Sequence, residues 1–267
     1  MKHFIKIVTI LVFTLTSLNA FEIFPFPKNA SLTENFSTNC LQMTQSQQIL
    51  KAYIMVGLKS NFQNPKENLK KAIVDYDIRA HKVKEYFQDL LKKSNKNGAD
   101  SAIKAFDEAM NLWQENKKML ELTPSKKNGL IIRKNFLKMI NKLLDGTKPL
   151  ATPDLELISL TGKLCRKPME ITIDYLLRIW GVDMPDFKQN VEKTINNFHK
   201  NLDTLSKSSL NNKESLALLQ KAKKQFRYFE FMYKAKSHFI PSLLSKKADD
   251  NFKIIRDIKK IYKQRAK

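Results

Sequence analysis

The sequence predicts an all-α protein made of two tandem antiparallel four-helix-bundle modules. Its 267 residues include six Gly and nine Pro, which are few for a strand-rich fold with many turns. Apolar residues recur at steps of three and four along most of the chain, as expected for helices with one buried face. Residues 41–83 also align without a gap with residues 163–205 when the numbers are shifted by 122. A repeat of this length indicates a duplicated helical module.

The alignment extends over both halves of each module. Tyr175 falls on Tyr53, and the turn at 183–187 falls on the turn at 61–65. Further along the chain, Phe252 aligns with Phe136 when the numbers are shifted by 116. The offset drops by six in the loop between the second and third helices, where a change in length is best tolerated. We therefore expect modules at residues 33–148 and 153–264.

Each element follows from local signals. In the first module we expect helices at about 34–60, from Pro65 to a break at 94–98, at 100–122 and at 129–144, with Ser31 or Thr33 as the first cap. The segment 145–149, Asp-Gly-Thr-Lys-Pro, is typical of a helix end.

The second module should repeat this series. We expect helices at about 152–180, 187–205 and 213–236, and a last one after Pro241. Pro168 lies inside the first of these and should kink it or split it in two, because proline removes a backbone donor.

The first twenty residues predict secretion. Lys2 and Lys6 precede an apolar run, and Ala20 provides a small residue for cleavage, as in a signal peptide. A retained membrane anchor is the alternative. We expect a periplasmic protein with no transmembrane or signalling region of its own.

The net charge of +22 raises the question of nucleic-acid binding. Of the 48 basic residues only seven are Arg, the residue that reads bases and phosphates best. The lysines are spread over every expected helix, which indicates solvated faces. We expect no nucleic-acid partner.

The two cysteines, Cys40 and Cys165, lie near the starts of equivalent helices. An even number of cysteines in an oxidising compartment favours a disulfide, which could form if the first helices of the two modules pack together. Two buried free thiols are the alternative.

Residues 46–53 of the repeat read Ser-Gln-Gln-Ile-Leu-Lys-Ala-Tyr. They are similar to the centre of the first-helix signature of the periplasmic sensor module of the PilJ/NarX type, which is found in pilus-associated chemotaxis transducers and nitrate sensor kinases. Residues 178–185 resemble its later part, and residues 248–262 resemble its closing helix. The resemblance covers nearly the whole chain after the signal, as two copies. It implies a helical sensor domain and a signalling partner, such as an inner-membrane sensor kinase or chemotaxis transducer.

The anion-reading arginines of that signature are not kept. Their positions hold Leu41, Met43 and Gln48 in the first copy, and Lys163, Cys165 and Glu170 in the second. Nitrate binding by the family's route is therefore not expected. Of the residues near the first helices, we select Gln47, Lys163 and Arg166 as candidates for binding a small polar or anionic ligand.

Catalysis finds little support in the sequence. His81 and His199 have no second ligand at metal spacing, and no phosphate-binding or nucleophile motif occurs. We expect no enzyme activity, cofactor or metal. The predicted function is a sensor-type protein that binds a small ligand, a membrane signalling partner or both. The alternative is a structural or interaction module of the envelope without a ligand.

Overall fold

The computed structural model describes residues 31–94, 98–235 and 240–265, and within these ranges it contains eight α-helices, one short 3-10 turn and no strand. The predicted all-α class is therefore confirmed. The first four helices are α1 (Leu32–Gly57), α2 (Pro65–Ser94), α3 (Ala99–Leu120) and α4 (Lys126–Thr147), and η1 (Lys148–Leu150) follows them. The second four are α5 (Pro153–Ile179), α6 (Phe187–Ser206), α7 (Lys213–Ala235) and α8 (Pro241–Arg265).

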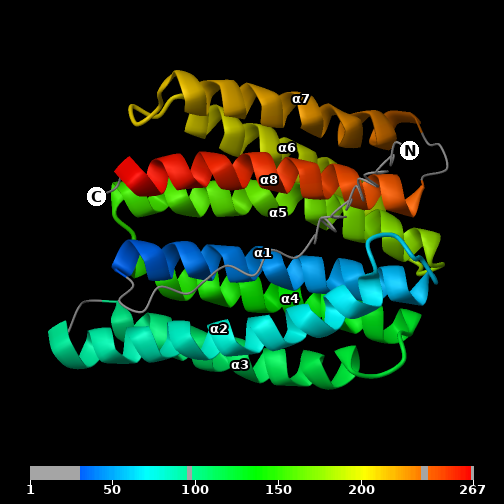
Figure 1. Ribbon diagram of the computed structural model, residues 1–267, viewed down its shortest axis with the longest axis horizontal. Helices are drawn as coiled ribbons and strands as arrows, with labels where there is room; N and C mark the ends of the chain where they lie inside the picture. The colour runs from blue at the N-terminus through cyan, green and yellow to red at the C-terminus, as the bar shows by residue number, and fades with distance from the viewer. Residues whose placement is uncertain (1–30, 95–97, 236–239, 266–267) are drawn as a thin grey trace, which may run out of the picture.

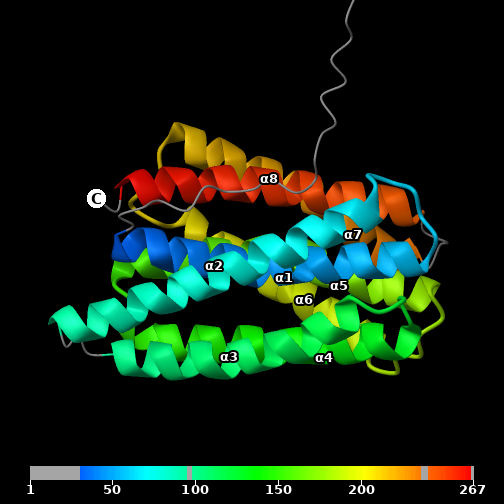
Figure 2. The same cartoon turned by 60° about the horizontal axis from the view of Figure 1, so that its bottom comes forward.

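The helices form two four-helix bundles that lie side by side (Figure 1). In each bundle every helix packs on the next along the chain, and the fourth returns to the first. Turning the molecule shows α2 crossing in front of α1, with α3 and α4 beneath (Figure 2). This arrangement is compatible with the two predicted modules.

Polar side chains cap the beginnings of three helices, and Ser31 is the first cap that the sequence predicts. The Ser31 hydroxyl accepts a hydrogen bond from the Glu34 backbone N–H, and the Ser31 backbone N–H donates to the Glu34 carboxylate, forming a capping box before α1. Ser125 caps α4, and Thr152 caps α5 ahead of Pro153. Each cap satisfies backbone donors that the first helical turn leaves free.

The two expected interruptions have different outcomes. Helix α5 is not split at Pro168, because one missing backbone hydrogen bond costs less than the burial of this helix among its neighbours contributes. The segment 145–149 does end the fourth helix, which stops at Thr147, three residues later than expected. Gly146 serves there to let α3 approach, since an added Cβ would lie 2.1 Å from the Cβ of Ala105.

The two modules meet mainly along α1 and α5, which start at the same end of the molecule (Figure 1). A Cβ added to Gly162 would lie 2.9 Å from the Cβ of Cys40. These two residues differ by 122 in number, so equivalent positions of the two copies face each other. At the other end of the interface the Trp180 ring covers Gly57 and Gly129. Glycines thus allow close contact between the modules at both ends.

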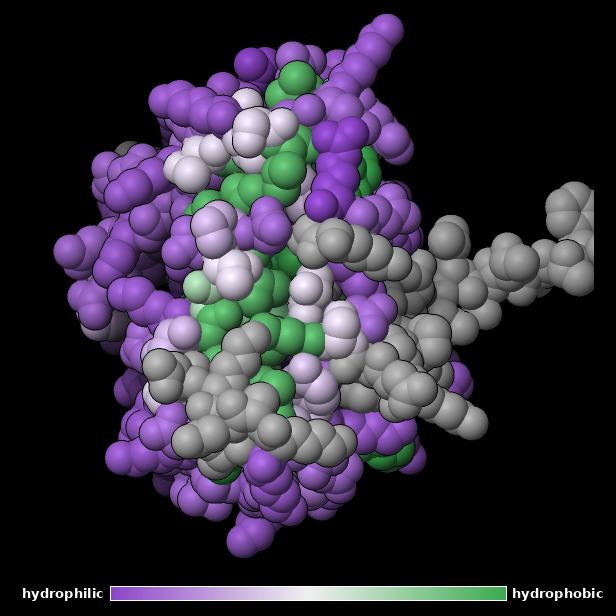
Figure 3. Space-filling model, turned by 90° about the vertical axis from the view of Figure 1, so that its left-hand side faces the viewer, coloured by the Kyte–Doolittle hydropathy of each residue, from purple (hydrophilic) through white to green (hydrophobic). Residues whose placement is uncertain are grey.

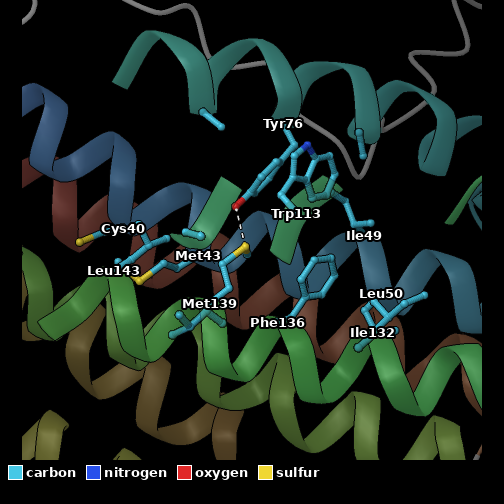
Figure 4. Close-up of a cluster of buried hydrophobic side chains, with 14 of the residues drawn as sticks. Cys40, Met43, Ile49, Leu50, Tyr76, Trp113, Ile132, Phe136, Met139 and Leu143 are labelled. Carbon is cyan, nitrogen blue, oxygen red and sulfur yellow. Dashed lines mark hydrogen bonds between the residues drawn. The ribbon is translucent and has the colours of Figure 1, made fainter. Parts of the chain in front are cut away.

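The aromatic residues of the third helices lie in the cores of their modules. In the first module the Trp113 ring packs between Tyr76 and Phe136, with ring centroids 4.2 and 6.3 Å away (Figure 4). The Tyr76 hydroxyl lies 3.5 Å from the Met139 sulfur. In the second module Phe226 stacks on Phe198 at 3.5 Å. Core packing, rather than a pocket between these rings, accounts for them.

The end of the molecule where α1 and α5 begin is mostly polar, with an apolar band crossing it (Figure 3). No helix in the described ranges is long and apolar enough to cross a membrane. The predicted signal segment, residues 1–20, lies outside the described residues.

A candidate ligand-binding cavity between the modules

Polar side chains of α1 point into the protein. Gln42, Gln45, Gln47, Gln48 and Lys51 are all less than 9% exposed, so solvent does not surround these residues. The reason is that α1 packs against α2, α4, α5 and α8 at once and has no free face. Buried polar groups need hydrogen-bond partners, so these residues should contact polar groups of the neighbouring helices.

Two buried ion pairs join the modules across their interface. Arg133 on α4 donates from Nε and Nη2 to the two carboxylate oxygens of Asp174 on α5, at 2.6 and 2.9 Å. Lys51 on α1 contacts Asp249 on α8 at 2.5 Å. Both pairs link a first helix of one module to the fourth helix of the other. Asp249 lies 116 residues after Arg133 and so occupies the equivalent position, whereas Asp174 lies 122 residues after Ala52, the neighbour of Lys51.

Beside the Arg133–Asp174 pair lies a cavity of about 160 Å³ between the modules. We call it the inter-module cavity. Helices α1 and α4 of the first module and α5 and α6 of the second supply its lining: Gln47, Arg133, Leu137, Lys167, Glu170, Ile173, Asp174, Asn190, Lys193, Thr194 and Asn197. A cavity of roughly 150 Å³ holds a molecule the size of benzene. This space therefore suits a small ligand.

The other copy of this crevice is nearly closed. Its pocket, near the Lys51–Asp249 pair, has about 20 Å³, room for roughly one water. Shifting Gln48, Lys51, Ala52 and Asn68 of that pocket by 122 gives Glu170, Ile173, Asp174 and Asn190 of the inter-module cavity. The duplicated site is thus filled by protein side chains in one copy and open in the other.

Charges in the cavity are partly compensated. Lys167 Nζ contacts Glu170 at 2.6 Å. Burial has the largest influence on the pKa of Glu170 and raises it, but Lys167, Arg166 and Arg133 together outweigh burial and hold this pKa below 4.5. Burial raises the pKa of Asp174 above 3.8; Arg133 opposes this shift and Glu170 adds to it.

The lowered pKa of Glu170 predicts a pH effect on stability. The stability that ionised Glu170 provides is fully present above pH 4.5, its unfolded-state value, and is lost as the pH falls through the lower folded-state pKa. The free-energy difference between wild type and Glu170→Gln should therefore be constant from pH 7 to 5 and shrink below pH 4.5. Urea unfolding at pH 7, 5, 4 and 3 measures it. A difference that stays constant down to pH 3 contradicts the prediction.

Of the three residues selected from the sequence, one lines the cavity. Gln47 does so, and its Nε2 has no hydrogen-bond partner among the described residues. Arg166 lies behind the lining, 3.8 Å from Glu170 and 3.5 Å from the Met43 sulfur. Lys163 is half-buried and is not part of the lining; its charge acts on the Cys40 thiol.

Sequence reasoning missed Arg133, Asp174 and the polar face of α6. One signal was available for Asp174, since an acid inside the apolar run 171–177, Ile-Thr-Ile-Asp-Tyr-Leu-Leu, indicates a buried partner. The sequence did not single out Arg133 as buried or paired, because lysines and arginines occur throughout this chain.

Both cysteines are buried, Cys40 lies where α1 meets α5, and the two sulfurs are not bonded in this structure. Burial raises the pKa of the Cys165 thiol to about 12 and that of Cys40 above 9.0, although Lys259 and Arg166 oppose the shift at both. Lys259 is itself buried and donates to the Ser37 carbonyl at 3.0 Å. The disulfide between Cys40 and Cys165 stays a prediction.

The two central histidines make local contacts. His81 Nδ1 lies 2.7 Å from the Asp77 carbonyl, and His199 Nε2 lies 2.7 Å from the Glu230 carboxylate. In the part of the chain that the structure describes, no group of three or more His, Cys, Asp and Glu side chains is placed to hold a metal ion.

Comparison with known proteins adds no relative: no family model, no curated protein and no solved structure matches this chain.

Proposed function

We propose that this chain is a non-enzymatic, sensor-type protein that holds a small polar or anionic ligand in the inter-module cavity. One observation carries the proposal. Gln47 is 2% exposed and lines a cavity of about 160 Å³, and its side-chain amide nitrogen is buried without a hydrogen-bond acceptor in the described structure. A buried unpaired donor costs about 1–3 kcal/mol. A bound ligand that accepts from this amide would recover that cost.

The position of the cavity indicates how ligand binding could change the arrangement of the two modules. Its lining comes from both modules, so a ligand would contact α1 and α4 on one side and α5 and α6 on the other. A ligand that prefers one placement of the modules shifts the protein toward it. We propose that a membrane partner, a sensor kinase or chemotaxis transducer, responds to this shift in the periplasm. The compartment and the kinship with PilJ/NarX-type modules are part of the proposal and rest on the sequence.

A thermal-shift screen with two matched variants tests ligand binding. The probes are nitrate, sulfate, phosphate, butyrate, butyramide, γ-aminobutyrate and glycerol. Gln47→Met places in α1 the residue that the second copy carries, Met169. Gln42→Leu likewise places in α1 the residue of the second copy, Leu164. It also removes a buried amide whose Nε2 has no partner in the described ranges, but this amide does not line the cavity.

At 100 times its Kd a ligand adds about 2.7 kcal/mol, which for a domain of this size raises Tm by roughly 5–10 °C. We expect at least one probe to raise the Tm of wild type and of Gln42→Leu, and to leave Gln47→Met unchanged. Equal shifts in all three proteins would place binding elsewhere. No shift with any probe would count against a ligand and favour a structural or interaction module.

A further inference from the structure

The hydrogen-bonding groups that line the inter-module cavity favour an acceptor-rich ligand. Arginine has five N–H groups, and Asp174 accepts from two of those on Arg133, which leaves three. Lys167 uses one of its three donors on Glu170. Lys193 forms no ion pair within the described ranges, and the Gln47 amide keeps both N–H groups. The lining thus offers more donors than its own acceptors use.

Charge limits the ligand further. Three cations, Arg133, Lys167 and Lys193, and two carboxylates, Glu170 and Asp174, line the cavity. Among these lining residues one positive charge is uncompensated. A single anionic group would balance it, whereas a dianion would face the two buried carboxylates with an excess of negative charge.

Shape and polarity distinguish kinds of anion. Leu137 and Ile173 contribute an apolar part to the wall. An inorganic oxyanion would leave that part without contacts, while a short hydrocarbon chain would cover it. A volume of about 160 Å³ matches roughly six non-hydrogen atoms, since a cavity of about 150 Å³ accepts benzene.

We propose that the inter-module cavity binds a short aliphatic monocarboxylate, with its carboxylate at the Arg133, Gln47 and Lys193 donors and its hydrocarbon chain on Leu137 and Ile173. This inference rests on the proposed ligand-binding function and assigns its ligand class. Lys193, exposed at the cavity rim, attracts the anion, and Arg133, held by Asp174, presents its remaining N–H groups.

Titration calorimetry at pH 7.5 with butyrate tests this class. Butyramide has the same number of non-hydrogen atoms without the charge, nitrate has the charge without the chain, and γ-aminobutyrate adds a cation. We expect butyrate to bind at least tenfold more tightly than each of these three. Gln47→Met should weaken butyrate at least tenfold, and Gln42→Leu should not. Lys193→Gln should weaken it a few-fold, while Lys71→Gln, its equivalent in the first module, should have no effect.

The outcomes separate the two proposals. If nitrate or γ-aminobutyrate binds best and Gln47→Met abolishes that binding, the carboxylate class is overturned and the ligand-binding function stands. If butyrate binds equally well to wild type and Gln47→Met, the assigned site is wrong. If no probe binds to wild type, the monocarboxylate proposal fails together with the ligand-binding function.

Discussion

Replacing Arg133 by methionine should lower the free energy of unfolding by about 3–5 kcal/mol, because it leaves the Asp174 carboxylate buried without its partner. The Asp174 side chain is 6% exposed, and both of its oxygens accept from Arg133. Urea unfolding at pH 7.5, followed by circular dichroism, measures the loss. It should shrink toward low pH, where Asp174 takes up a proton.

The double variant Arg133→Met/Asp174→Leu should recover most of this loss, since an apolar pair can replace a buried ion pair at little cost. A matched control is Lys142→Ala, which breaks the Lys142–Glu108 pair on the surface, where each side chain is about one third exposed. We expect less than about 1 kcal/mol for that change. If Arg133→Met costs no more than Lys142→Ala, the pair does not hold the modules together.

Gly162→Ala should destabilise the protein by about 1–3 kcal/mol, and Gly162→Leu by more, because there is no room for a side chain where α1 and α5 meet. The new Cβ would lie 2.9 Å from the Cβ and 3.3 Å from the sulfur of Cys40. In an ordinary helix interior the same Gly→Ala change would stabilise by about 1 kcal/mol. The sign of the effect therefore reports the contact between the modules.

A double variant that moves the glycine from α5 to α1 provides the control. In Cys40→Gly/Gly162→Ala the close contact disappears, and the nearest remaining atom, the Cys40 Cα, lies 3.8 Å from the new Cβ. This double variant should be more stable than Gly162→Ala alone, at the cost of about 1 kcal/mol for a glycine inside α1. Thermal and urea unfolding compare the variants. A double variant that is no more stable than Gly162→Ala would show that the modules separate easily at this point.

The helices follow from local chemistry, and most of them could be predicted. Ser31 before α1, Pro65 at the start of α2 and the turn before Phe187 are short-range signals, and the structure places helix ends there. Pro168 does not split α5, and α4 continues through Gly146 to Thr147, because the effect of each residue depends on a neighbouring helix. At Gly146 the neighbour is Ala105 on α3, and nothing near residue 146 in the sequence indicates that contact.

The candidate site was predictable only in part. Gln47 was selected for its place on the first helix, and it does line the cavity. Arg133 on α4 and Asp174 on α5 lie 41 residues apart in the sequence, and Lys193 lies on α6. Their contact depends on how one bundle docks on the other, and helical periodicity within a module contains no information about that docking.

By itself, the sequence determined the helical class and the duplication, because apolar periodicity and caps act over a few residues and the repeat preserves both. The tertiary structure alone decided that the modules lie side by side with α1 and α5 in contact. It also decided that one copy of the duplicated crevice is filled by Lys51 and Asp249 while the other stays open beside Arg133 and Asp174. The physical reason is that packing between modules depends on side-chain volume and charge from four helices at once, and no local pattern specifies that combination.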